Sequence, residues 1–250
     1  MQLADYQHRY RHIAIKREDG VIELRLHGDG GVAKWGSGPT SLHAELGTAF
    51  ADLARDAENR VVVLTGTGDV FMAEMDPDDR APEPSLAEMW PRIMEEGTAL
   101  LHNHLAIPVP VIAAVNGPAL IHAEIAVMAD IVLAAPHAEF ADAPHAVNGV
   151  VPGDGVHIVW PMLLGPNRGR SFLLTGERIG AEEAKRLGVV AEVVAADRLL
   201  PRAHEHARRL AGHSPQMLRY TRALLVREWR RRMADELQLG LGLEGLAMIR

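Results

Sequence analysis

Hydrophobic and polar residues alternate in some segments of this chain and recur at helical spacing in others. Residues 21–27 (VIELRLH) alternate as a half-buried strand does, after a turn signal at Asp19–Gly20. Residues 60–66 (RVVVLTG) and 109–115 are almost continuously apolar, which is typical of strands buried on both faces. Apolar residues spaced three and four apart predict a helix over 41–55. Strands and helices therefore alternate in the first half.

The second half of the pattern is mainly helical. It predicts helices over 92–105 and 121–129, strands over 131–135 and 138–141, and helices over 156–164, 167–175, 181–187, 197–212, 215–234 and 235–249. Residues 75–91, rich in proline and acidic side chains, predict a surface loop or lid. Strand–helix alternation with a helical tail indicates an α/β fold. We expect a core over 1–195 and a C-terminal helical region over 196–250.

Composition narrows the class of protein. With 250 residues, 48% hydrophobic and 24% charged, the chain is typical of a soluble globular protein. It contains no apolar run long enough for a membrane helix and no signal-peptide core, so we expect a cytoplasmic protein without a membrane partner. The absence of cysteine excludes disulfides and thiolate metal sites. A net charge of -7 argues against nucleic acid as a partner. We interpret the arginine-rich segment 226–233 (VREWRRRM) as a solvated helix face or a subunit contact.

One histidine and one aspartate stand out in residues 141–155 (ADAPHAVNGVVPGDG), where repeated proline and glycine predict bends. A histidine can take a proton from water near neutral pH, and a carboxylate on its other ring nitrogen fixes the tautomer. We therefore predict that His145 and Asp154 form a catalytic pair. The simpler interpretation is that Asp154 caps the helix at 156 and that His145 is a capping or core-edge residue.

Three more residues are candidates. His122 falls in the first turn of the helix predicted over 121–129, where free N–H groups favour a developing oxyanion; otherwise it lines a subunit surface. Trp35 offers an indole N–H to a carbonyl, or it packs in the core. Glu244 falls on an apolar helical stripe, so a buried carboxylate there needs a partner, which could be His145 or the catalytic water. The stripe consists of Met233, Leu237, Leu241 and Met248. The alternative for Glu244 is an exposed helix end.

Common catalytic motifs are missing from the sequence. Residues 66–71 (GTGDVF) lack the third glycine of a dinucleotide fingerprint and the lysine of a P-loop, and no G-x-S-x-G or H-E-x-x-H occurs. A metal bound by His122, His145 and Asp154 is chemically feasible, but nothing in the sequence fixes their approach. We therefore expect neither a metal nor an organic cofactor.

Residues 60–76 (RVVVLTGTGDVFMAEMD) and 107–155 resemble the crotonase (enoyl-CoA hydratase/isomerase) superfamily. A strand, a glycine turn, a second strand and a small-residue turn before a helix occur in that family's order, and residues 167–194 extend the resemblance. The resemblance implies a spiral of repeated ββα units with C-terminal helices that form a homotrimer, or a hexamer made of two trimers.

The departures from the family pattern imply a particular reaction. Where hydratases of the family usually have a second glutamate, this chain has His145, and Asp154 replaces a small residue. The glycine-rich turn before the helix reads Leu120-Ile121-His122-Ala123, while Glu124 keeps a hydratase carboxylate. This combination is similar to β-diketone hydrolases of the 6-oxocamphor hydrolase type. It implies retro-Claisen hydrolysis of a diketone, the small-molecule substrate, to a keto acid.

Two alternatives remain open. The first is a CoA-thioester enzyme (hydratase, isomerase or acyl-CoA hydrolase), which is what most of this superfamily comprises. Against it stands an acidic stretch that would repel the CoA phosphates. Its acidic residues are Glu74, Asp76, Asp78, Asp79, Glu83 and Glu88, opposed only by Arg80. The second is a catalytically idle binding module, and the three candidate catalytic side chains argue against it.

Overall fold

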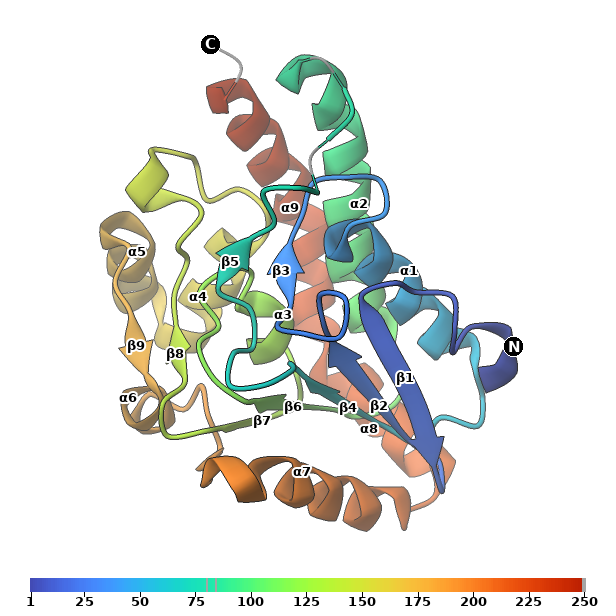
Figure 1. Cartoon of the computed structure of the whole chain (residues 1–250). Coiled ribbons are helices and arrows are strands. Elements are labelled where there is room, and N and C mark those ends of the chain that lie inside the picture. The colour runs from blue at the N-terminus through green and yellow to red at the C-terminus, as the bar shows by residue number, and fades with distance from the viewer. Residues whose placement is uncertain (80, 84, 249–250) are drawn as a thin grey trace.

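The computed structural model describes residues 1–79, 81–83 and 85–248 (Figure 1). The strands are β1 (Ile13–Glu18), β2 (Val21–Leu26), β3 (Lys34–Trp35), β4 (Val61–Thr65), β5 (Glu74–Met75), β6 (Val111–Val115), β7 (Ile131–Ala134), β8 (Glu139–Phe140), β9 (Ile179–Gly180) and β10 (Glu192–Val193). The helices are α1 (Leu42–Arg55), α2 (Leu86–Ala106), α3 (Glu124–Val127), α4 (Val156–Leu164), α5 (Pro166–Thr175), α6 (Ala181–Arg186), α7 (Ala196–Ala211), α8 (Pro215–Leu225) and α9 (Arg227–Met248). The predicted α/β class is confirmed.

The main sheet has the strand order β1-β2-β4-β6-β7-β10. Strand β1 pairs antiparallel with β2, and the other neighbours run parallel. In β4, Val62 and Leu64 belong to the large hydrophobic core, whereas Val61 and Val63 belong to a second, smaller core. The two apolar segments therefore form strands buried on both faces, as predicted. Strand β1 was not predicted, because only Ile13 and Ile15 are buried on this edge strand.

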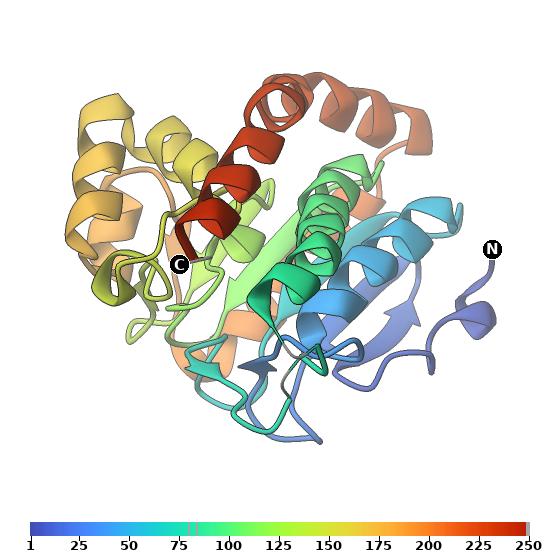
Figure 2. The same ribbon diagram turned by 90° about the horizontal axis from the view of Figure 1, so that it is seen from above.

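Helices cover both faces of the sheet (Figures 1 and 2). Helix α1 packs along α2 on one face, and α9 packs against α2. Helix α7 covers the opposite face, where it contacts β4, β6 and β2. The larger core lies between the sheet and α1, α2 and α9, and the smaller core lies under α7.

The predicted start of α2 and the predicted break between α8 and α9 are wrong. Helix α2 begins at Leu86 rather than 92, because the Ser85 hydroxyl accepts the Glu88 N–H as an N-cap and Pro91 is accommodated inside the helix. The predicted loop over 75–91 is therefore shorter, and its Arg80 lies outside the described residues. The chain also breaks between α8 and α9 at Val226, which is buried, rather than near residue 234.

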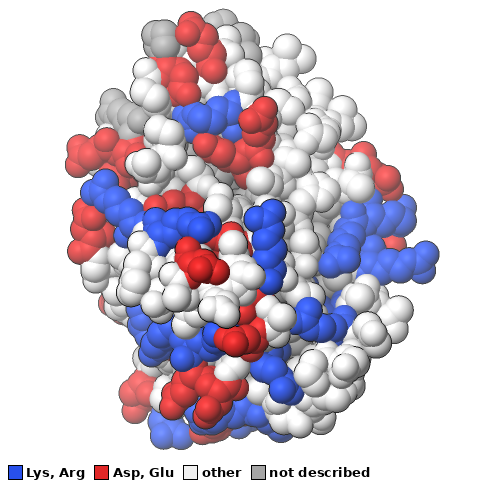
Figure 3. Space-filling view, turned by 90° about the vertical axis from the view of Figure 1, so that its right-hand side faces the viewer, with Lys and Arg blue, Asp and Glu red and all other residues white. Residues whose placement is uncertain are grey.

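Charges of both signs are mixed on the surface. Figure 3 shows Lys and Arg side chains interspersed with Asp and Glu over the face that it draws. In the segment 226–233, Arg231 and Arg232 pair with Glu228 one turn earlier. Among the described residues, no helix combines the length and the apolar character that crossing a membrane requires.

The topology gathers several loops at one edge of the sheet. Strands β2, β4 and β6 run parallel, so the segments that follow their carboxyl ends meet there. These segments carry Trp35 in β3, Met75 in β5, and His122 just before α3. The segment after β8 adds His145, and α9 approaches from the C-terminal end of the chain.

Candidate active site

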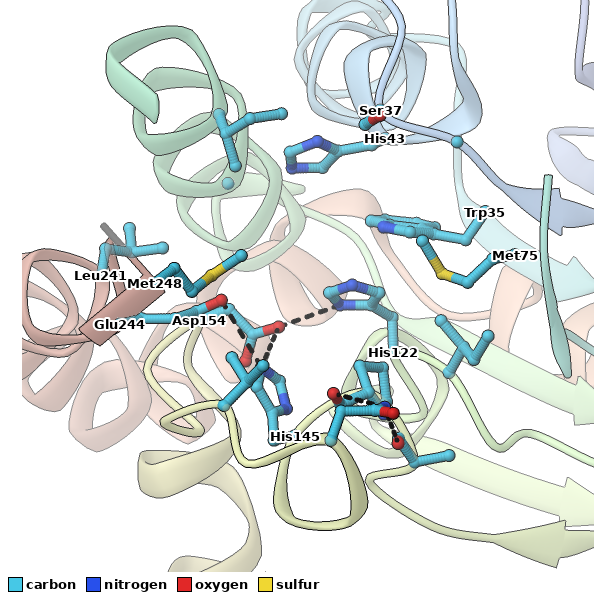
Figure 4. A pocket seen from close by; sticks show the side chains of 18 of the residues that line it. Trp35, Ser37, His43, Met75, His122, His145, Asp154, Leu241, Glu244 and Met248 are labelled. Atoms are coloured by element: carbon cyan, nitrogen blue, oxygen red, sulfur yellow. Dashed lines mark hydrogen bonds and ion pairs between the residues drawn. The ribbon is translucent and has the colours of Figure 1, made fainter. Parts of the chain in front are cut away.

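A cavity of about 480 Å³ lies at this edge (Figure 4). All five residues proposed from the sequence line it, namely Trp35, His122, His145, Asp154 and Glu244. Most of the remaining wall is apolar and includes Met75, Met89, Trp90, Ile93, Leu100, Ile121, Val150, Leu241 and Met248. The cavity therefore surrounds a few polar groups with a hydrophobic wall, as small-molecule sites do.

His145 is buried, with a carboxylate beside each ring nitrogen. Its Nδ1 lies 2.5 Å from Asp142 Oδ1. Its Nε2 lies 3.6 Å from Asp154 Oδ2 and 3.6 Å from Glu244 Oε1. Burial disfavours the imidazolium, but Asp154 and Asp142 outweigh burial and raise the pKa of His145 to about 11. With a pKa of about 11, the imidazole of His145 is charged at neutral pH.

Asp154 lies between two imidazoles, and this position differs from the prediction. Its Oδ2 is 3.4 Å from His122 Nδ1 and 3.6 Å from His145 Nε2. Asp154 is thus near His145, as expected. However, it faces Nε2 on the cavity side of the ring, whereas a carboxylate that orients the ring was expected on the other nitrogen. Burial disfavours the carboxylate, yet His145 and His122 hold the pKa of Asp154 below its ordinary value. Although Asp154 precedes α4, its carboxylate faces the histidines (Figure 4).

His122 does not belong to a helix turn as predicted. It precedes Ala123, the N-cap of α3, and its backbone has a φ of 49°. Its Nδ1 donates to Glu124 Oε1 at 2.7 Å, and its ring lies 3.9 Å from the Trp35 ring, centroid to centroid. Burial lowers the pKa of His122, but Glu124 outweighs this effect and the net pKa is raised. In place of the helix-dipole support for an oxyanion that the sequence suggested, the structure puts the His122 imidazole at the cavity, with a raised pKa.

Glu244 reaches the cavity from α9 and is 7% exposed. Its Oε1 faces His145, the partner that the sequence suggested, and its Oε2 makes no hydrogen bond to another described residue. Burial raises the pKa of Glu244, and His145 opposes this shift. A carboxylate with a raised pKa is a stronger base than an ordinary glutamate.

The structure adds two polar residues that sequence reasoning missed, Asp142 and His43, and it places Glu124, which the sequence indicated only as a hydratase carboxylate, beside His122. Asp142 contacts His145, and Glu124 contacts His122. His43, on α1, lines the cavity, with its Nδ1 3.3 Å from Glu96 and its ring 5.1 Å from the Trp35 ring. Burial lowers the pKa of His43, which favours the neutral imidazole. Of the two missed residues, Asp142 alone left a signal in the sequence, because it lies three residues before His145 in the same bent segment.

Two overlapping sets of side chains could hold a divalent cation. His122, Glu124 and Asp154 form one set, and His145, Asp154 and Glu244 form the other. Within each set the ligand atoms lie within 4.8 Å of one another. Imidazole and carboxylate donors suit zinc or iron. The same groups are also suitably placed to bind and polarise a water molecule.

The chain belongs to the enoyl-CoA hydratase/isomerase family, which residues 39–244 match. It is an enzyme of the crotonase superfamily. The carnitinyl-CoA dehydratase of Salmonella arizonae is 36% identical over an alignment of 196 residues, and the match covers 73% of this chain and 72% of the relative. The dehydratase of Shigella flexneri is 35% identical, and the match covers 68% of this chain and 65% of the relative.

Solved structures share the fold over nearly the whole chain. A β-diketone hydrolase from the cyanobacterium Anabaena sp. PCC 7120, bound to (S)-3-oxocyclohexyl acetic acid, is 41% identical with a TM-score of 0.92. That match covers 97% of this chain and 96% of the other. An enoyl-CoA hydratase/isomerase from Mycobacterium paratuberculosis is 25% identical with a TM-score of 0.85, covering 96% of this chain and 94% of the other.

Proposed function

We propose that this enzyme hydrolyses a carbon–carbon bond of a cyclic β-diketone, by a retro-Claisen reaction that yields a keto acid. The observation that carries the proposal is that two adjacent groups of polar side chains, here called poles, lie in one apolar cavity. His145, Asp154 and Glu244 form one pole, and His122 with Trp35 forms the other (Figure 4). A 1,3-diketone has two carbonyls one carbon apart, so one pole can serve each carbonyl.

The first pole activates water. A water molecule bound between His145 Nε2 and the carboxylates of Asp154 and Glu244 loses a proton as its oxygen attacks one carbonyl carbon. Because the pKa of His145 is raised to about 11, the ring is already protonated, and we assign the proton from water to a carboxylate. Of the two carboxylates, Glu244 is the stronger base, since its pKa is raised and that of Asp154 is lowered. The imidazolium of His145 then donates a hydrogen bond to the oxygen that becomes negative.

The second pole stabilises the leaving carbanion. When the bond between the hydrated carbonyl carbon and the α-carbon breaks, its electron pair becomes an enolate on the second carbonyl. His122 keeps Nδ1 on Glu124, so Nε2 and the indole N–H of Trp35 are the donors available to that enolate oxygen. The proton that the carboxylate took from water then passes to the α-carbon, which completes the keto acid and restores the enzyme. One diketone and one water are consumed, and no other reactant is needed.

The proposal requires neither a metal nor an organic cofactor, since water, imidazole and carboxylate provide every step. Likeness to the Anabaena β-diketone hydrolase over 97% of the chain supports it. The second candidate is a CoA-thioester reaction, which the family and the carnitinyl-CoA dehydratases favour. Glu124 is the carboxylate that such a reaction would use, but it is buried and hydrogen-bonded to His122.

A substrate panel tests the two candidates against each other. Cyclic and bicyclic 1,3-diketones are incubated with the enzyme in EDTA, and loss of the enol absorbance is followed. We expect turnover of at least one diketone, reduced by about 10² to 10⁴ in His145→Ala. Calorimetric titration with CoA and acetyl-CoA should show no binding. Tight CoA binding without diketone turnover, or activity that returns only with one added metal, contradicts the proposal.

A further inference from the structure

The imidazole of His145 has two edges, and different carboxylates occupy them. Asp142 Oδ1 lies 2.5 Å from Nδ1, within hydrogen-bond distance. Asp154 and Glu244 both lie 3.6 Å from Nε2, which is longer than a direct hydrogen bond. Among the polar contacts of the ring with the described residues, the contact with Asp142 is the one of hydrogen-bond length.

Asp142 is placed for this contact by backbone hydrogen bonds on both sides. The Ala141 N–H donates to the Ala119 carbonyl at 3.2 Å, and the Ala143 N–H donates to the Leu120 carbonyl at 2.9 Å. The turn is therefore held without the Asp142 side chain. Asp142 is 3% exposed, and its Oδ2 has no hydrogen-bond partner among the described residues. Among the described residues, His145 is the one hydrogen-bond and ion-pair partner of this buried carboxylate, so the carboxylate has no evident structural role apart from that histidine.

We propose that Asp142 is the positioning residue of His145, a role that rests on the proposed function and deepens it. Its carboxylate accepts the Nδ1–H and thereby turns Nε2 into the cavity, between Asp154 and Glu244. Asp154 is then not the residue that orients the ring. It lies between His145 and His122, so it couples the two poles of the site.

The ring state can be measured without any substrate. In uniformly labelled [15N]histidine enzyme, a charge-assisted hydrogen bond to a carboxylate should give a low-field proton attached to Nδ1 of His145. His145→Gln assigns the resonance. We expect Asp142→Asn to abolish it, since the neutral amide binds the proton less strongly. Asp154→Asn should retain it, because that carboxylate lies beyond the other nitrogen.

Turnover gives the second measurement, with the diketone that the panel identifies. Asp142→Asn should lower kcat by about 10²-fold and change KM by less than about threefold, since the ring is misplaced but the substrate wall is intact. The alkaline limb of the pH profile should shift to lower pH, because losing an anion lowers the pKa of His145. The other ionisable groups facing this ring, Asp154 and Glu244 directly and His122 beyond Asp154, stay unchanged in the variant.

Glu23→Gln is the matched control. Glu23 is 2% exposed and accepts a hydrogen bond from His204 at 2.7 Å, in the cleft beside α7, away from the cavity. It should lower stability while preserving the low-field resonance and the pH profile. Loss of the resonance in Asp154→Asn but not in Asp142→Asn overturns the assignment, as does its absence from the wild-type enzyme. If the resonance behaves as expected but no diketone is cleaved, the positioning role stands and the proposed function falls.

Discussion

His122 is one of three residues other than glycine with a positive φ among the described residues, together with Asp19 and Asp29. The left-handed conformation costs a residue with a Cβ about 1–2 kcal/mol. Packing holds it there, since the ring lies against Trp35 on one side and its Nδ1 donates to Glu124. Such strain often occurs at functional residues, and here it directs an imidazole at the cavity.

The charge state of His145 separates two mechanisms through the pH dependence of kcat/KM. If a carboxylate takes the proton and His145 stays charged, kcat/KM should be level from about pH 7 to 9.5 and fall toward pH 11, because the raised pKa keeps the imidazole protonated until then. Initial rates across this range, corrected for enol ionisation of the substrate, provide the measurement. If neutral His145 were the base, kcat/KM would instead rise about tenfold per pH unit.

Helix α9 contains three glycines that reduce its helix propensity, and two of them allow close packing. A Cβ on Gly240 would lie 2.3 Å from the Gly153 carbonyl oxygen. A Cβ on Gly245 would lie 2.0 Å from Trp90 Nε1, and that indole donates to the Leu241 carbonyl at 3.2 Å. The close approach at Gly240 brings α9 to the loop that carries Asp154, and the one at Gly245 brings it to the Trp90 side chain of α2, so Glu244 can face His145.

Alanine substitutions along α9 should separate packing from helix propensity. Gly240→Ala and Gly245→Ala should each destabilise the protein by about 1–3 kcal/mol through overpacking, and displacing Glu244 should lower kcat by at least about tenfold. Gly242 has nothing within 4 Å of a built Cβ, so Gly242→Ala should stabilise by about 0.5–1 kcal/mol with unchanged kcat. Urea unfolding and initial rates measure both effects. Equal behaviour of the three variants would exclude a packing role.

The C-terminal helices leave apolar side chains exposed on the surface of the single chain. Met233, Leu237 and Leu241 are buried, so the apolar stripe that carries Glu244 packs inside the same chain. A second set takes its place on α9, with Leu239 66%, Leu243 48% and Leu246 70% exposed. These positions are four and three residues apart, so they share one helix face. Tyr220, Leu224 and Leu225 of α8 are also exposed.

We expect this surface to be covered in a homotrimer or hexamer, because a monomer rarely exposes so many clustered leucines. Light scattering at micromolar concentration should give three or six times the mass of the chain. Leu239→Glu combined with Leu243→Glu should shift the mass toward the monomer. Leu174→Glu serves as control for the added charge, since Leu174 is 80% exposed on α5. A wild-type monomer would contradict the assembly.

The sequence by itself determined the features that depend on near neighbours. Continuous apolar runs predicted β4 and β6, and an interval of three and four residues predicted α1, because both periods are properties of the local backbone. The bent segment 141–155 likewise indicated His145 and Asp154, which it brings within 3.6 Å of each other. At the start of α2, Ser85 favours a helix start whereas Pro91 favours a break, so this boundary could not be predicted from the pattern.

Only the tertiary structure decided which atoms face one another. The assignment of Asp142 to Nδ1, and of Asp154 and Glu244 to Nε2, depends on ring rotation and on α9, whose Glu244 lies 99 residues after His145 in the chain. His43 enters the cavity from α1 through packing against α2 and Trp35. Sequence patterns report burial and backbone conformation, whereas hydrogen-bond partners depend on side-chain torsions that the packed neighbours fix. The candidate residues could therefore be named from the chain alone, but their roles required the fold.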